Sequence, residues 1–149
     1  MSRFVLLVLG LVVVGACVVV GRVLLVSTAL PEGPVPAVWD HEACAYCRMH
    51  IGEPPFAAQL QTKDGQVLFF DDPGCLFEML DRDGPQVHAM YFHHMREDRW
   101  IGTDDVAFLE TKPTPMGYGI AAVTRGVAGA VSFDAAREIV RSKREDRQK

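Results

Sequence analysis

The feature that most constrains this chain is an uncharged apolar run near its N-terminus. Residues 4–21, between Arg3 and Arg22, contain no acidic or basic side chain and are mostly aliphatic. A run of this length can cross the hydrocarbon core of a bilayer as a helix, or it can direct secretion. We therefore expect residues 1–30 to form a membrane anchor or a lipoprotein-type signal, separate from the globular part of the chain.

The charges around this run predict its orientation. Arg3 precedes the run, and a positive flank favours a cytoplasmic N-terminus, so the remaining domain is expected on the periplasmic or extracytoplasmic side of the cell membrane. Residues 14–17, VGAC, also resemble a lipobox in which Cys17 would be lipidated. Because the apolar sequence continues beyond Cys17, we favour an uncleaved anchor and keep lipidation as the alternative.

The charge balance of the remaining chain argues against nucleic acid as a partner. The protein has 15 basic and 19 acidic side chains, and two of the basic ones, Arg3 and Arg22, lie in the anchor. Basic residues are concentrated at the C-terminus, where residues 143–149 are interpreted as a basic tail at a solvated helix end. A nucleic-acid-binding domain needs a basic face instead.

Turn and cap signals predict an α+β domain over residues 39–142, after an extended Pro-rich linker over 31–38. In its first half, apolar runs around a Gly-containing loop predict a β-hairpin, and DDPG predicts a helix capped by Asp71 or Asp72. The predicted elements of this half are strands at 56–62 and 66–71, a helix that ends at Gly84, and a strand at 87–94. The second half is predicted to hold strands at 104–111, 119–125 and 130–133, and a terminal helix that begins near Asp134.

The stretch CAYCRMH, residues 44–50, is the strongest candidate for chemistry. Haem attachment would need His directly after the second cysteine, and a structural zinc site usually needs four ligands in paired motifs. A redox-active CxxC usually opens a helix, whereas no good helix is predicted here, and a disulfide between Cys44 and Cys47 would close too small a loop to stabilise the fold much. A zinc site, a redox pair and a structural disulfide remain alternatives.

Met49 favours copper over the other interpretations of this stretch. Two thiols and a thioether within six residues form a soft donor set, and such donors select Cu(I). Met116 lies between Pro115 and Gly117, in a loop that would present its side chain. The sequence therefore favours a Cu(I) site formed by Cys47, Met49 and Met116, with Cys44 as a further ligand.

Other candidates are weaker. Cys75, in the first turn of the predicted helix, is more often a buried core residue than a ligand, and His93 and His94 are expected to be exposed at a strand end. Adjacent strand residues point to opposite faces, so at most one of these two histidines could join one site. DDPG is better explained as a helix cap than as a catalytic carboxylate pair. The sequence contains no catalytic triad order, phosphate loop or metalloprotease motif, so we do not expect an enzyme.

Four of these segments together resemble the NosL family, the accessory copper proteins of nitrous oxide reductase maturation. They occur in family order over about residues 39–135: a Cys-x-Met element (Cys47, Arg48, Met49), PPFAAQL, FDDPGC and TPMGYG. The resemblance implies a fold of two ββαβ-like halves, and only GVAG separates GIAAVTR from AVSF, so the second half is expected to be abbreviated. It also implies that Cys47, Met49 and Met116 are the favoured ligands, with Cys44 an addition to the family pattern.

The function implied by the resemblance is that of a membrane-tethered extracytoplasmic Cu(I) chaperone. Its partners would be nitrous oxide reductase or another copper enzyme and the maturation transporter of that enzyme, and a metal-linked dimer is conceivable because an open sulfur-rich site can bridge two chains. Two alternatives belong to other classes. One is a thiol-disulfide protein that uses the Cys44 and Cys47 pair, and the other is a membrane-anchored adaptor whose cysteines are structural.

Overall fold

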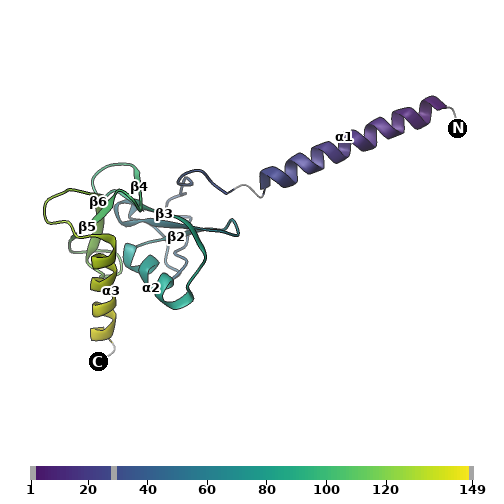
Figure 1. Ribbon diagram of the computed structural model, residues 1–149. Helices are drawn as coiled ribbons and strands as arrows, with labels where there is room; N and C mark the ends of the chain where they lie inside the picture. The colour runs from purple at the N-terminus through teal and green to yellow at the C-terminus, as the bar shows by residue number, and fades with distance from the viewer. Residues whose placement is uncertain (1–2, 28–29, 148–149) are drawn as a thin grey trace. The chain divides into compact units, whose positions relative to one another are not determined.

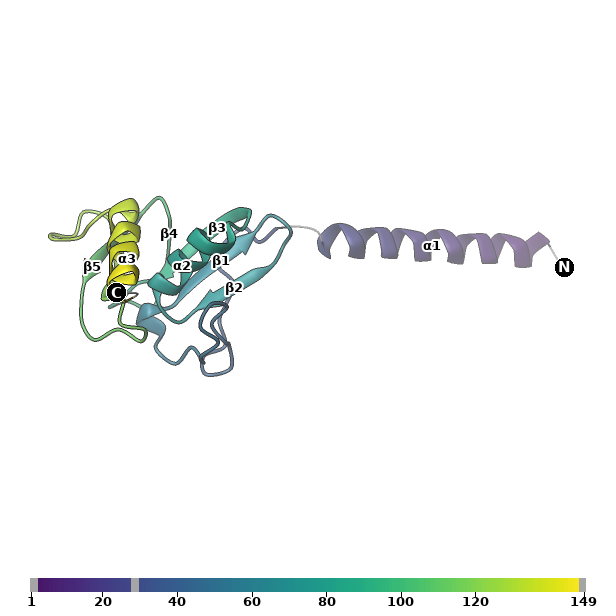
Figure 2. The same cartoon turned by 90° about the horizontal axis from the view of Figure 1, so that it is seen from below.

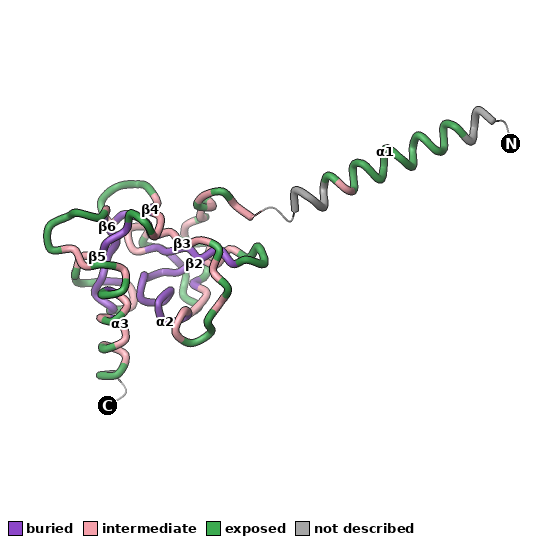
Figure 3. Tube along the Cα trace, in the orientation of Figure 1, coloured by how far each residue is buried: buried purple, intermediate pink, exposed green. Residues whose placement is uncertain are grey.

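The computed structural model describes residues 3–27 and 30–147, and the chain forms two compact units, Met1–Leu30 and Pro31–Lys149. The first unit contains helix α1 (Arg3–Ser27), the purple helix of Figure 1. Nearly all of its described side chains, at residues 7–22, are exposed (Figure 3). Among the residues described here, no helix meets the length and apolarity that a membrane span requires.

The second unit is built on a four-stranded antiparallel sheet with the order β2-β1-β3-β4. A one-turn 3-10 helix, η1 (Pro54–Phe56), leads into it. The strands are β1 (Ala58–Thr62), β2 (Val67–Phe70), β3 (Val87–His93) and β4 (Trp100–Gly102). The predicted hairpin is therefore confirmed, with Leu60 of β1 opposite Leu68 of β2.

Helix α2 (Pro73–Asp83) connects β2 to β3 and packs against β1, as Figure 2 shows. The side chain of Asp72 caps the helix by accepting a hydrogen bond from the Gly74 N–H at 2.8 Å. Gly84 ends the helix in the left-handed conformation, with φ 53°, which glycine adopts without steric cost. The predicted ββαβ order of the first half is confirmed, and Asp72, rather than Asp71, is the cap.

The second half consists of a hairpin and a terminal helix. β5 (Val106–Glu110) pairs with β6 (Ile120–Thr124), and α3 (Phe133–Arg147) packs against β5 and α2. The third strand predicted at 130–133 is reduced to one bridge, between Val131 and Phe108, because α3 begins at Phe133. Residues 143–147 of the predicted basic tail belong to α3.

Aromatic side chains join the two halves in one core. Their ring centroids lie 5.0–6.3 Å apart, mostly in edge-to-face arrangements, and they come from α2, β3, β5 and α3: Phe77, Phe92, Phe108 and Phe133. Such pairs add about 0.5–1.5 kcal/mol each beyond the area they bury. Helix α2 lies at the centre of this core, which gives its N-terminal turn a fixed position.

The Pro-rich segment 31–38 contains no helix or strand, and it is attached to the domain. The Gln59 side chain accepts a hydrogen bond from the Val35 N–H at 2.9 Å and donates one to the Val35 carbonyl at 2.8 Å. Gln61 donates to the Gly33 carbonyl at 2.7 Å. Two buried amides of β1 therefore hold this segment against the sheet.

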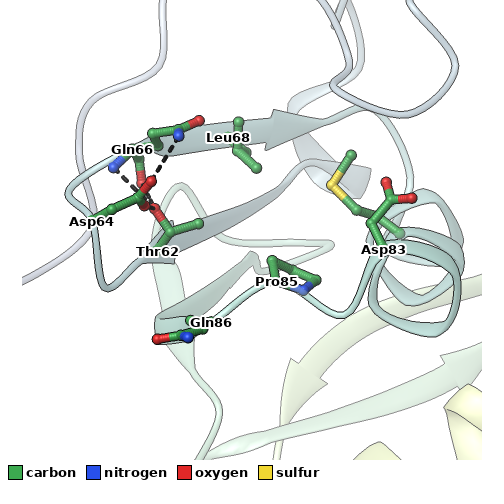
Figure 4. A pocket seen from close by; sticks show the side chains of 8 residues that line it. Thr62, Asp64, Gln66, Leu68, Asp83, Pro85 and Gln86 are labelled. Carbon is green, nitrogen blue, oxygen red and sulfur yellow. Dashed lines mark hydrogen bonds between the residues drawn. The ribbon is translucent and has the colours of Figure 1, made fainter.

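A cavity of about 550 Å³ lies beside the β1–β2 turn and the end of α2, and Figure 4 shows the side chains that line it. Its lining includes Asp64, which accepts hydrogen bonds from Thr62 and Gln66, together with the apolar side chains of Leu68 and Met79. The described residues that line it include no cysteine or histidine, and Cys75 lies at the other end of α2.

Candidate metal centre

The loop that contains CAYCRMH is a tight reversal closed by a β-bridge between Ala43 and His50. Within it, the Cys44 N–H donates to the Met49 carbonyl at 2.8 Å, and the Arg48 N–H donates to the Cys44 carbonyl at 3.0 Å. Arg48 lies in the left-handed region with φ 68°, an uncommon position for a side-chain-bearing residue. No helix begins at this loop, as predicted, and the turn brings both cysteines to one side.

The loop is fixed to the sheet through its first cysteine. Ala45 donates its N–H to the Phe69 carbonyl of β2 at 2.9 Å, and Cys44 is fully buried. Cys47 is half-buried, whereas 53% of Met49 is exposed. The loop thus runs from a buried thiol through a partly accessible thiol to an exposed thioether.

Helix α2 supplies a third thiol. Cys75 lies in its first turn, where the Cys75 N–H donates to the Asp72 carbonyl at 2.9 Å, and its side chain is fully buried. The sulfur atoms of Cys44, Cys47 and Cys75 all lie within 4.8 Å of one another. All three are free thiols, so the structure contains the Cys44 and Cys47 pair without a disulfide.

The three thiols differ in charge. A hydrogen bond from the Cys75 thiol is the main cause that lowers the pKa of Cys44, and the backbone N–H groups of Cys47, Asp71 and Tyr46 add to it, so that this pKa falls to about 5 despite burial. Donation to Cys44, together with burial, raises the pKa of Cys75. Burial also raises the pKa of Cys47. These directions make Cys44 the thiol of the cluster that is most readily deprotonated.

The loop that carries Met116 is attached to the same end of α2. The Asp72 carboxylate, which caps the helix, also accepts a hydrogen bond from the Met116 N–H at 3.3 Å. The Tyr118 ring lies so close to Gly74 that a Cβ at that position would be 2.1 Å from Cγ of the ring. The helix end and the loop 112–119 therefore fit together, and Met116 is partly buried against the core that contains Cys44 and Cys75.

The prediction that His93 and His94 are exposed is wrong, since only 4% and 5% of these residues is accessible. The His93 ring contacts Trp39 and Trp100 edge-on, with centroids 5.7 and 5.3 Å away. Nδ1 of His94 accepts the Arg96 N–H at 3.2 Å, which occupies that nitrogen. Among the described residues, neither histidine belongs to the cysteine cluster.

The structure thus brings together two of the four predicted ligands, Cys44 and Cys47, with Cys75, which the sequence had assigned to core packing. Met116 lies on a loop held by the cap of the same helix, and Met49 extends from the cysteine loop toward solvent. The signal for Cys75 was present in DDPGC, since a cysteine three residues after a helix cap occupies the first turn. The missing information was which loop that turn faces.

Comparison with known proteins agrees with this architecture. A crystal structure of the copper chaperone NosL from Shewanella denitrificans superimposes with a TM-score of 0.51 at 22% sequence identity, covering 75% of this chain and 89% of that chain. No match was found among curated proteins. The family model of NosL matches residues 34–138, well over half of the sequence. The chain belongs to the NosL family.

Proposed function

We propose that this protein is a Cu(I) chaperone that holds the ion at the sulfur-rich site and releases it to a partner. The observation that carries the proposal is the convergence of three free thiols within 4.8 Å, two from the loop that also bears Met49 and one from the first turn of α2. Soft thiolate and thioether donors favour Cu(I) over oxygen-preferring ions. The structural similarity to the copper chaperone NosL from Shewanella denitrificans supports the same cargo.

In this proposal Cys47, Met49 and Met116 exchange the ion with the partner, and Cys44 supports them from inside. A carrier needs a ligand set that a partner can reach, and Cys47 and Met49 are the accessible members here. Thioethers bind in their neutral form, whereas thiols must lose a proton first. Cys47 is the thiol of the pair that a partner disulfide could reach, and burial raises its pKa, which disfavours the thiolate that thiol-disulfide exchange needs. The role is that of a carrier, not a catalyst.

We further propose that the domain is tethered to the cell membrane on its periplasmic or extracytoplasmic side. The support is helix α1, whose exposed side chains are mostly aliphatic along residues 7–20 and need an apolar environment to cover them. The family suggests nitrous oxide reductase or another copper enzyme, with its maturation transporter, as the acceptor. A metal-linked dimer would be compatible with an exposed Met49.

The test is a titration of the reduced, anaerobic full chain in detergent with Cu(I) against a chromophoric competitor. All variants carry Cys17→Ser, which removes the exposed thiol of α1. We expect one tightly bound copper per chain, weaker binding in Cys47→Ser and Met116→Leu, and unchanged binding in the matched thioether control Met95→Leu. Absence of competitive binding by the parent protein would exclude the carrier function.

A further inference from the structure

Cys75 has an environment unlike that of an ordinary buried cysteine. A free cysteine in a core normally packs as a small apolar side chain, and this one does contact the core formed around Leu76 and Phe77. Its sulfur, however, also lies within 4.8 Å of two other sulfurs and is hydrogen-bonded to one of them, Cys44. Packing alone does not require three thiols to meet.

The spacing of these sulfurs fits one metal ion. Three sulfurs that surround a single ion at about 2.3 Å in a plane lie about 4 Å from one another. The observed limit of 4.8 Å is slightly wider than this, so binding would require only small movements of the side chains. The three residues come from two elements, the CAYC loop and α2, and both are fixed to the sheet by backbone hydrogen bonds or core packing.

The backbone around the cluster suits negatively charged sulfur. N–H groups of Tyr46, Cys47 and Asp71 point at Cys44, and the Met49 N–H donates to Cys47. Cys75 lies in the first turn of an eleven-residue helix, where the helix dipole stabilises an anion. Each of the three sulfurs therefore has a nearby source of positive potential.

We infer that Cys75 is a ligand for the cargo and that Cys44, Cys47 and Cys75 form an inner three-thiolate seat for Cu(I). The inference rests on the proposed function and adds a second layer to the site. On binding, the protons that the thiols still carry leave to water and three copper–sulfur bonds form, with no change in oxidation state. The ion is held at this inner seat, and Met49 and Met116 form an outer layer through which it is exchanged.

In this arrangement the three inner thiolates retain the Cu(I) ion, and the two outer methionines transfer it. Thiolates bind Cu(I) through charge as well as softness, so the inner seat retains the ion, and burial of Cys44 and Cys75 keeps solvent and oxidants away from it. Cys47 is the half-buried member, and it connects the seat to the exposed Met49 on the same loop. A partner that approaches Met49 would therefore meet Cys47 before the two buried thiols.

The experiment counts sulfur neighbours of copper by X-ray absorption in the Cu(I)-loaded full chain. The decisive variant is Met49→Leu/Met116→Leu in the Cys17→Ser background, because the thiols of the cluster are then the remaining sulfur donors of the proposed site. We expect three sulfur neighbours in this variant. A Cys75→Ser substitution should lower the count by one and weaken Cu(I) affinity by at least about 100-fold, because loss of a direct ligand should cost no less than loss of a residue that only supports a ligand.

The outcomes separate this inference from the proposed function. Two or fewer sulfur neighbours in the double methionine variant, or unchanged affinity in Cys75→Ser, would overturn the three-thiolate seat while leaving the chaperone function intact. Failure of the parent protein to bind Cu(I) would overturn both. If Cys75→Ser does not fold, the double methionine variant decides alone, because its changes fall on an exposed and a half-buried side chain.

Discussion

The Asp72 carboxylate joins helix α2 to the backbone of Met116. One oxygen accepts the Gly74 N–H at 2.8 Å and the other accepts the Met116 N–H at 3.3 Å, in a residue that is fully buried. The same carboxylate therefore caps the helix that presents Cys75 and positions the loop that presents Met116. Two parts of the site that lie far apart in the sequence depend on one side chain.

Replacing Asp72 should damage both the fold and the outer layer of the site. We expect Asp72→Ala to lower the free energy of unfolding by about 1–3 kcal/mol, because the cap and a buried hydrogen bond are lost together. Urea unfolding measures the first effect, and the Cu(I) competition measures weaker binding. Asp104→Ala, at an exposed position, is the control. Unaltered Cu(I) affinity in a destabilised Asp72→Ala protein would show that the position of Met116 is unimportant.

The close fit of Gly74 against Tyr118 gives a second prediction. A Cβ on residue 74 would overlap the Tyr118 ring, with three ring and side-chain atoms within 2.6 Å. Gly74→Ala should therefore displace the loop 112–119 and cost about 3 kcal/mol of stability. Gly33→Ala is the matched control, since nothing lies within 4 Å of a Cβ there. Thermal unfolding compares the two, and equal melting temperatures would contradict the predicted packing.

The hydrogen bond that the Cys75 thiol donates to Cys44 should leave a detectable Cys44 thiolate in the metal-free protein. Because the pKa of Cys44 is lowered to about 5, its thiolate is present above that pH and is lost as the pH falls through it. The ultraviolet absorbance of thiolate, followed from about pH 8 to pH 4, should show one transition near pH 5. Cys75→Ala removes the main donor and should move this transition to higher pH. A protein without thiolate absorbance at pH 7 would contradict this arrangement.

Local chemistry was sufficient to predict most of the fold. The hairpin of β1 and β2, the cap at Asp72, the end of α2 at Gly84 and the loop around Met116 all depend on neighbouring residues. Strand β4 was not predicted, because it has only three residues and begins in a polar stretch. Trp100 of β4 stacks on Trp39, with ring centroids 6.2 Å apart, and this long-range contact is invisible in a local pattern.

The site was predicted only in part, because some of its residues are brought together by contacts that are long-range in the sequence. Cys44 and Cys47 are only three positions apart in the sequence, so their spacing pointed to a common site, whereas Cys75 reaches them only through the packing of α2 against the sheet. His93 was expected to be exposed because a strand end usually is, and its burial depends on Trp39 and Trp100. Residues brought together by tertiary contacts were thus the ones that sequence patterns missed.

Asp71 provides a pH-dependent prediction for stability. Burial, and then the nearby Cys44 thiolate, raise the pKa of Asp71 to about 6. A raised carboxyl pKa means that the folded state binds the proton more tightly than the unfolded state, so stability falls as the pH rises from about 4 to about 6. Asp71→Asn should therefore stabilise the metal-free protein by about 1–3 kcal/mol at pH 7 and by little near pH 4. Urea unfolding at both pH values tests this, and an equal effect at both would contradict it.

Gln59 should determine whether the Pro-rich segment stays on the sheet. Its amide makes two hydrogen bonds to Val35 and accepts one from Gln61 at 2.9 Å, all at a fully buried position. Gln59→Leu leaves both backbone groups of Val35 without this partner, so we expect a loss of about 2–3 kcal/mol and faster proteolysis within residues 31–38. The exposed Gln86→Leu substitution is the control.

The two readouts for Gln59→Leu distinguish attachment from general stability. If the segment is held by the glutamine pair, cleavage within residues 31–38 should accelerate even under conditions where the rest of the domain remains folded and resistant, because the backbone there becomes accessible locally. Cleavage that rises only in parallel with global unfolding would show that the amides stabilise the sheet without retaining the segment. In that case other contacts would retain the segment, such as the one between Nε2 of His88 and the Pro31 carbonyl at 3.3 Å.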